Sequence, residues 1–127
     1  MDAKSSARAT VESSSDELAD LSRWMYHNPE VAFQEHRTSA KLAEYLSSRG
    51  FEVEYPAYGL ETAFVARTGS SGPEVVICAE YDALPGVGQA CGHNIIAASA
   101  LGAGLALKDM AESLGIRVTV LGTPAEE

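Results

Sequence analysis

The sequence is poor in basic residues, with nine lysines and arginines against 18 aspartates and glutamates in 127 residues. The resulting formal net charge of -9 argues against binding to nucleic acid or to an anionic membrane surface, because both require basic patches. Cysteine is also scarce: Cys78 and Cys91 are too few for a disulfide framework, and a reducing compartment would keep them as thiols. The charge suits cationic or amine-bearing ligands.

Long hydrophobic runs are missing as well. The longest stretch without a charged residue, from about residue 83 to residue 107, contains Pro85, several glycines and His93, so it is not a membrane span. Residues 1–11 contain no apolar segment of the kind found in signal peptides. We therefore expect a cytoplasmic protein that does not enter membranes, with enough hydrophobic residues for one core.

The first part of the chain has helical periodicity. Residues 1–13 are rich in serine and alanine without an apolar pattern, and we expect them to be a disordered leader, with residues 14–127 forming the folded part. From Ser14, capping and apolar residues follow at helical spacing as far as Pro29. A second helix is expected to follow and to end at Gly50.

The periodicity then changes to that of an α/β fold. We expect strands at residues 51–55, 62–67, 75–79 and 116–121, and a helix from Asn94 to about Leu114. The third strand is apolar on both faces, which favours the middle of a sheet and a buried Cys78. Strand, helix and strand form a parallel βαβ unit, so the predicted fold is a partial open sheet with N-terminal helices.

This βαβ unit brings polar residues to one edge of the sheet. Glu80 and Asp82 follow its first strand, and Glu126 and Glu127 follow its second strand. The triplet Cys91–His93 opens the connecting helix at the same edge. Open α/β sheets bind ligands at the carboxyl ends of their strands, so we expect a functional site here.

The triplet contains two kinds of metal ligand. A thiolate and an imidazole separated by Gly92 can reach one ion, and the helix N-terminus is expected to lower the pKa of Cys91. Of the carboxylates Glu126 and Glu127, one can bind metal and the other can move protons, as metal hydrolases require.

Each of these features also has a structural interpretation. The triplet can be a capping loop, and the terminal carboxylates can be a solvated acidic segment. Glu80 and Asp82 can cap the loop, or they can orient a ligand or contact a substrate ammonium. His27 and His36 are expected to be surface or capping residues.

Three ordered motifs carry a family resemblance. They are Ala79–Pro85, Ala90–Asn94 and Gly122–Glu127, and the segment from Tyr26 to Thr38 adds to them. Together they resemble the N-terminal part of the catalytic domain of M20 metallopeptidases, in particular the amidohydrolase (M20D) branch. The resemblance runs from about Leu18 to the last residue and implies part of a zinc-peptidase catalytic domain.

The resemblance implies a metal-dependent hydrolase that cleaves amide bonds in N-acyl amino acids or dipeptides. Complete members use two divalent ions, such as zinc or manganese, and are often homodimers. By the same resemblance Cys91, His93 and Glu127 would be metal ligands, Glu126 the general base, and Asp82 a second catalytic residue.

The sequence also departs from the family pattern. Glu80 stands where other members of the clan have a ligand histidine, so the resemblance does not assign it as a ligand, and Gln89 replaces a frequent histidine. The further histidine ligands and the lid or dimerisation domain of the family are absent from these residues, so we expect a fragment with little activity alone. A non-catalytic metal-binding or interaction remnant with an unpaired sheet edge is the main alternative. A dinucleotide fold is disfavoured because Cys91 stands where the third glycine would be needed.

Overall fold

Four helices and four strands make up residues 2–127, the part of the chain that the computed structural model describes; Met1, the first residue of the expected leader, lies outside it. The helices are α1 (Ala3–His27), α2 (His36–Ser48), α3 (His93–Lys108) and α4 (Ala111–Leu114). The strands are β1 (Glu52–Glu54), β2 (Phe64–Thr68), β3 (Glu74–Glu80) and β4 (Arg117–Thr123). They form one sheet in the order β1-β2-β4-β3, in which β3 and β4 are parallel and the other pairs antiparallel. The expected α/β fold with its parallel βαβ unit is confirmed.

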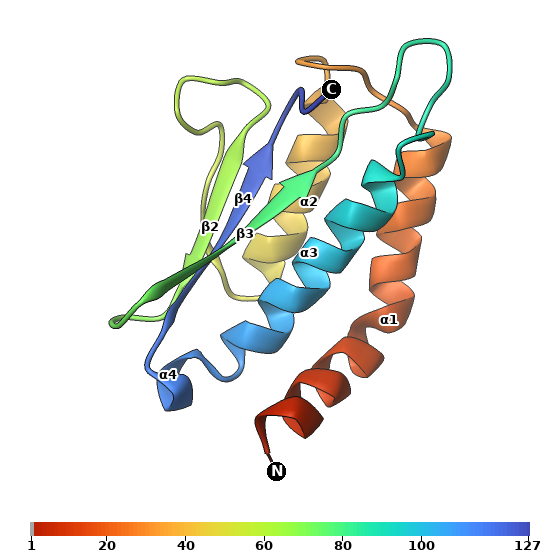
Figure 1. Cartoon of the computed structure of the whole chain (residues 1–127). Helices are drawn as coiled ribbons and strands as arrows, with labels where there is room; N and C mark the ends of the chain where they lie inside the picture. Colours follow the sequence, from red (N-terminus) through yellow and green to blue (C-terminus); the bar gives the residue numbers. More distant parts are fainter. Residues whose placement is uncertain (1) are drawn as a thin grey trace.

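The helices form two layers against this sheet. Helix α3 packs on β3 and β4, α2 packs on β1 and β2, and α1 packs on α3 as an outer layer (Figure 1). The core between the layers includes Met25, Leu42, Leu101, Phe64 and Val120, all of which are fully buried. Among residues 2–127, no helix combines the length and the apolar character needed to cross a membrane.

Helix α1 covers residues 3–13, which we expected to belong to a disordered leader over residues 1–13, so that expectation is wrong for them. The carboxylate of Asp2 caps the helix by accepting the backbone N–H three residues further on at 2.8 Å. Thr10 then donates a hydrogen bond to Asp109, just beyond α3, at 2.7 Å. The segment is therefore held by polar contacts, which an apolar pattern does not reveal.

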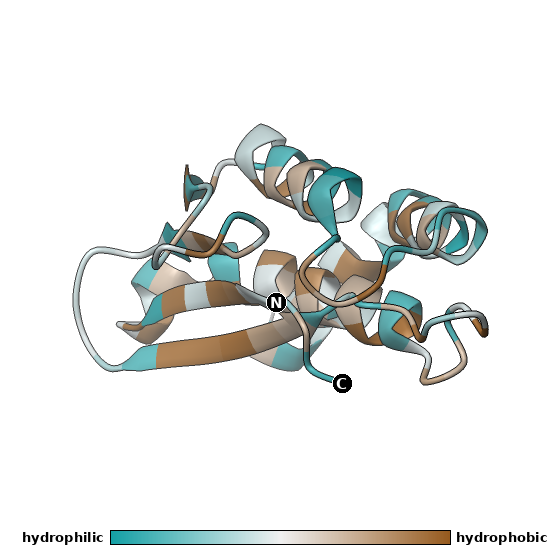
Figure 2. Ribbon diagram, turned by 90° about the horizontal axis from the view of Figure 1, so that it is seen from above, coloured by the Kyte–Doolittle hydropathy of each residue, from teal (hydrophilic) through white to brown (hydrophobic). Residues whose placement is uncertain are grey.

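Strand β3 lies at the edge of the sheet, not in its middle as we predicted. Within residues 2–127 it pairs with β4 alone, and Figure 2 shows it as a hydrophobic strand along the rim of the sheet. Ile77 and Ala79 pack toward the core, whereas Val76 and Cys78 lie on the opposite face because side chains alternate along a strand. Val76 is 50% exposed and Cys78 is exposed, so the prediction of a buried Cys78 is also wrong.

The small residues of α3 permit close packing. A Cβ atom on Gly104 would lie 2.6 Å from Cγ2 of Val120, and one on Gly102 would lie 3.0 Å from a leucine of α1. These glycines let α3 approach both β4 and α1. The helix ends at Lys108, earlier than expected, and the short helix α4 follows before Gly115.

Gly122, at the carboxyl end of β4, lies directly against the ring of Phe64. A Cβ atom there would overlap Cδ2 of that ring, which stacks on Tyr81 with 6.0 Å between ring centroids. We expect Gly122→Ala to lower the free energy of unfolding by about 1–3 kcal/mol, because the buried ring must move. Urea denaturation measures this loss.

A second substitution makes this prediction specific to the ring. Phe64→Leu creates space for the added Cβ atom. The loss of unfolding free energy in the double variant should therefore be smaller than the sum of the losses in the two single variants. Strict additivity would contradict the steric explanation.

Candidate metal centre

Strands β3 and β4 end at the same edge of the sheet, as expected for parallel strands. Glu80, the last residue of β3, pairs with Thr123, the last residue of β4. The first turn of α3 and the segment after β4 lie at this same edge (Figure 1). The three segments that the sequence predicts to meet are therefore together.

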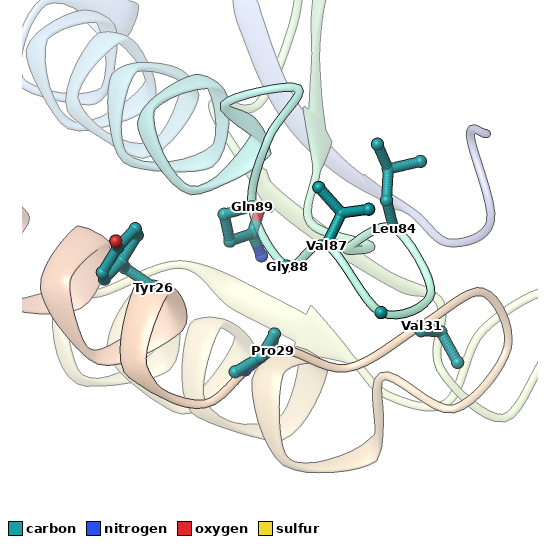
Figure 3. A pocket seen from close by; sticks show the side chains of 8 residues that line it. Tyr26, Pro29, Val31, Leu84, Val87, Gly88 and Gln89 are labelled. Atoms are coloured by element: carbon teal, nitrogen blue, oxygen red, sulfur yellow. The ribbon is translucent and has the colours of Figure 1, made fainter.

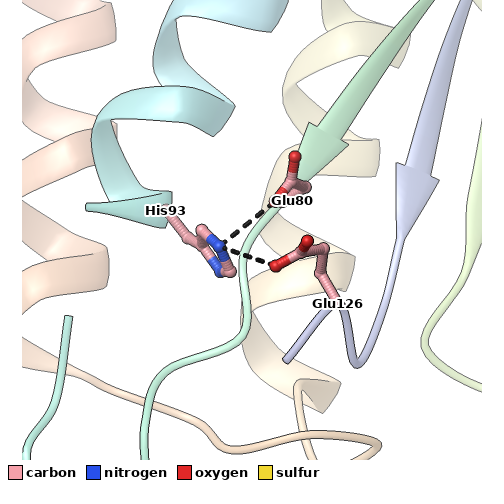
Figure 4. A group of neighbouring side chains, drawn as sticks. All are labelled: Glu80, His93 and Glu126. Atoms are coloured by element: carbon pink, nitrogen blue, oxygen red, sulfur yellow. Dashed lines mark ion pairs between the residues drawn. The ribbon is translucent and has the colours of Figure 1, made fainter. Parts of the chain in front are cut away.

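His93 is the centre of this group. It is the first residue of α3, and its imidazole is only 3% exposed. Its Nδ1 lies 2.8 Å from the backbone carbonyl of Asp82 and carries the hydrogen, because a carbonyl oxygen can only accept. Its Nε2 consequently faces the carboxylates, with oxygens of Glu80 at 3.1 Å and of Glu126 at 3.3 Å (Figure 4). An oxygen of Glu127 lies at 3.6 Å from the same nitrogen.

The charges around His93 alter its proton affinity and that of its neighbour. Burial alone lowers the pKa of His93, but the Asp82 carbonyl and the charges of Asp82, Glu80 and Glu126 outweigh burial and raise this pKa above its ordinary value. The pKa of Glu126 is raised too, chiefly by the negative charge of Glu80. The edge of the sheet is therefore strongly electronegative.

This arrangement fits a divalent cation. A lone pair on Nε2 that faces three carboxylates is repelled by them unless a proton or a metal ion lies between. Glu80, His93 and Glu126 each offer a ligand atom within 4.8 Å of the others. An imidazole with several carboxylates is a donor set that zinc and manganese accept.

Asp82 connects the imidazole to the acidic segment after β4. It is 1% exposed, and its Oδ1 lies 3.1 Å from Nδ1 of His93. Its two oxygens accept the backbone N–H groups of Glu126 and Glu127 at 3.2 and 3.1 Å. One buried carboxylate thus holds three other members of the group in place.

Cys91 lies at the margin of the group and is exposed. A hydrogen bond with the side chain of Glu127 raises the pKa of the Cys91 thiol, and the charges of Glu127 and Glu126 add to this effect. The expected lowering of this pKa by the helix N-terminus is therefore wrong. The carboxylates of Glu127 and Glu126 favour the protonated thiol because each carries a full negative charge.

The structure brings most of the predicted site residues together. Asp82, His93, Glu126 and Glu127 are in mutual contact, and Cys91 reaches them through Glu127. Glu80, which the sequence leaves between several roles, joins them at the imidazole. His27 and His36 are exposed on other segments, as expected for surface residues.

Sequence reasoning missed one residue, Glu35. Its side chain is fully buried, and its Oε2 accepts the backbone N–H of Ala125 at 2.7 Å. A glutamate just before a helix usually indicates a cap or a surface position. Nothing local in the sequence shows that it reaches a loop 90 residues away.

A hollow of about 430 Å³ lies next to this edge, between the end of α1 and the loop that joins β3 to α3 (Figure 3). Its lining comprises Tyr26, Pro29, Val31, Leu84, Gly86, Val87, Gly88 and Gln89. The side chain of Gln89 donates to the carbonyl of Tyr81 at 3.5 Å and accepts the N–H of Asn94 at 3.2 Å. Gln89 therefore ties this loop to the first turn of α3, which carries His93.

Comparisons with known proteins give consistent relatives. The chain is 41% identical to Xaa-Arg dipeptidase of Mus musculus in an alignment that covers 98% of the chain and 32% of the relative. It is 30% identical to a p-aminobenzoyl-glutamate hydrolase polypeptide of Escherichia coli, over 92% of the chain and 28% of that protein. A dinuclear metal-binding peptidase of the M20 family from Bacillus subtilis superposes with a TM-score of 0.78 at 27% identity, over 94% of the chain and 36% of that structure.

No family model matches the chain. The chain spans about a third of the length of these relatives.

Proposed function

We propose that the chain forms part of a metal-dependent hydrolase of the M20 family, because almost its whole length is similar to about a third of a dipeptidase, a hydrolase and an M20 peptidase. Its substrates would be N-acyl amino acids or dipeptides, whose amide bond it would help to cleave. The observation that carries this proposal is the convergence of one buried imidazole and three carboxylates at the carboxyl ends of two parallel strands. Packing of the core does not require such a group of polar side chains.

The metal ligands are proposed from the types of donor atom at this edge of the sheet, and geometry supports His93 and Glu80 among them. His93, Glu127 and Cys91 would bind one or both of two divalent ions in the complete enzyme, zinc or manganese. The carboxylate of Glu80 lies as close to Nε2 of His93 as any other in the group, which supports adding it to the ligands. A metal ion held there supplies a Lewis acid that polarises the amide carbonyl and lowers the pKa of water.

Glu126 suits the role of general base. Its side chain is 49% exposed, so it can reach a substrate, and its carboxylate lies 3.3 Å from the imidazole that would hold the metal. In this role it takes a proton from the attacking water and gives one to the leaving nitrogen. Asp82 orients it by accepting its backbone N–H.

The experiment that tests the proposal measures metal binding and turnover together. Titration calorimetry with Zn²⁺ and Mn²⁺ should show binding to the chain, whereas N-acetyl amino acids and dipeptides should not be turned over. We expect this because two metal ions need several ligands each, and the remaining two histidines lie elsewhere. A chain that binds neither ion contradicts the proposal.

A chimera separates the enzyme from its rival, a non-catalytic remnant. The chain can replace the corresponding third of the mouse relative, to which it is 41% identical. If the chain is part of an enzyme, the chimera should hydrolyse the dipeptides that the relative hydrolyses, and the matched Glu126→Gln chimera should not. A folded, metal-bound but inactive chimera favours the remnant, which the unpaired edge of β3 also suits.

The remaining features of the proposal follow the relatives and the charge. The partner is a small molecule, and complete members of the family would form homodimers. The net charge of -9 supports the absence of nucleic-acid and membrane partners, and a cytoplasmic location stays a prediction.

A further inference from the structure

We propose that Glu35 is a positioning residue, whose buried carboxylate fixes the loop that presents Glu126 and Glu127 to the metal. This inference rests on the proposed function, because it concerns the same site. Glu35 itself touches neither His93 nor the other members of the acidic group by any hydrogen bond or ion pair among residues 2–127. It acts through the backbone of the loop after β4.

Three successive N–H groups of this loop are held by two buried carboxylates. Glu35 accepts the N–H of Ala125 at 2.7 Å, and Asp82 accepts those of Glu126 and Glu127 at 3.2 and 3.1 Å. Glu35 is fully buried and Asp82 is 1% exposed. Two buried carboxylates therefore fix the backbone that orients Glu126 and Glu127. Glu35 accepts the shortest of the three hydrogen bonds.

Ala125 has an unusual backbone conformation that requires this support. Its φ of 54° lies in the left-handed region, which costs an alanine free energy because its Cβ crowds the following carbonyl. Such a conformation persists where its surroundings determine it. The hydrogen bond to Glu35 acts on the very residue at which the chain turns toward His93.

Further contacts hold Glu35 itself in position. Its Oε1 accepts the hydroxyl of Thr62 at 3.2 Å, and the carbonyl of Thr62 accepts the hydroxyl of Tyr81. Tyr81 directly precedes Asp82 and is fully buried. The two carboxylates that hold the loop are thus connected through one buried network, which starts at the N-terminus of α2 and ends at the carboxyl end of β3.

Burying a carboxylate at this position costs free energy. No lysine, arginine or histidine pairs with Glu35 in the described part of the chain, so only N–H and O–H donors compensate its burial. Apolar residues of similar volume commonly stabilise a fold as well as buried charges do. The two carboxylate oxygens here accept two donors, Thr62 and Ala125, which approach from different elements.

The variant Glu35→Gln tests the inference. Glutamine has the same size, and its amide N–H can donate to the hydroxyl of Thr62 while its oxygen still faces Ala125. The variant therefore removes the negative charge that strengthens the hydrogen bond from the N–H of Ala125. We expect calorimetry to show at least about 10-fold weaker Zn²⁺ binding, the range typical for groups that orient metal ligands. The visible absorption of the Co²⁺-loaded chain should change as well, since it reports the geometry of the ligands around the ion.

Glu30→Gln is the matched control. The carboxylate of Glu30 accepts hydrogen bonds from the backbone and hydroxyl of Thr38 at 2.7 and 2.6 Å. Among the described residues it forms no hydrogen bond or ion pair with the loop after β4. Its loss should lower the melting temperature without changing Zn²⁺ affinity or the Co²⁺ spectrum. If lower stability in general reduced metal binding, both variants would lose Zn²⁺ affinity to the same extent. That result would overturn the positioning role of Glu35.

Hydrogen exchange of the wild-type chain tests the inference even if Glu35→Gln does not fold. The amide of Ala125 should exchange slowly, and exchange at the rate of an unstructured peptide overturns the inference. If the wild-type chain binds neither Zn²⁺ nor Co²⁺, the proposed metal site fails and the purpose given to Glu35 fails with it. If the wild-type chain and Glu35→Gln bind Zn²⁺ with equal affinity, only the role of Glu35 is overturned and the proposed metal site stands.

Discussion

Replacing His93 with alanine is expected to lower the affinity of the chain for Zn²⁺ by more than about 100-fold. Removal of a ligand should cost at least as much as removal of a group that only orients one, for which losses of about 10- to 100-fold are usual. The imidazole is the only nitrogen donor in the group of potential ligands found among residues 2–127, and its Nε2 is the point on which the carboxylates converge. Titration calorimetry with a competing chelator measures the change.

His27→Ala is the control for this experiment. His27 is exposed at the end of α1 and belongs to no part of the acidic group, so its loss should leave Zn²⁺ affinity unchanged. Equal affinities of the His93→Ala and wild-type chains would show that Zn²⁺ binds elsewhere, for example to exposed carboxylates alone.

Asp82→Ala is expected to lower the free energy of unfolding by about 3 kcal/mol, because a buried, hydrogen-bonded charge cannot be removed without stranding its partners. The variant leaves the backbone N–H groups of Glu126 and Glu127 without acceptors and takes a carboxylate away from His93. Chemical denaturation measures the loss, provided that the slope against denaturant stays constant.

Asp20→Ala provides the matched control. Asp20 forms an exposed pair with Arg23 at 3.2 Å, within one turn of α1, and such pairs contribute little. Its removal should change the free energy of unfolding by less than about 0.5 kcal/mol. If Asp82→Ala were as mild, the network around Asp82 would not hold the loop after β4.

The sequence was sufficient to place the candidate site because the decisive information is local. The change from helical to strand periodicity identifies β3, α3 and β4, and a helix that connects two strands of one sheet is typical of parallel strands. Parallel strands end at the same edge, so Glu80, Asp82, Glu126 and Glu127 could be brought together without knowledge of any other element.

The position of β3 depends on information that periodicity does not contain. An apolar strand can lie in the centre of a sheet, or at its edge with one face uncovered, and its residues look alike in both cases. The order β1-β2-β4-β3 is decided by contacts between distant segments. This explains the wrong predictions for the strand and for Cys78.

Two further errors arise from polar contacts. The start of α1 is held by Asp2 and by the bond between Thr10 and Asp109, none of which contributes to an apolar pattern. Glu35 resembles an ordinary helix-start residue, and only the folded chain shows that it is buried beside Ala125. Buried polar networks are recognised from geometry because each partner, taken alone, is a common surface residue.

The strand order also determines when the site can form during synthesis. The strand that joins β2 to β3 is β4, the last of the four to leave the ribosome. Until β4 and the residues after it have emerged, the nascent chain can pair only β1 with β2, β3 stays unpaired, and His93 has no acidic loop to contact. A metal ion that binds the folded site more tightly than the unfolded chain can therefore stabilise the fold only after this segment has been translated. From then on, binding shifts the folding equilibrium toward the native state by mass action.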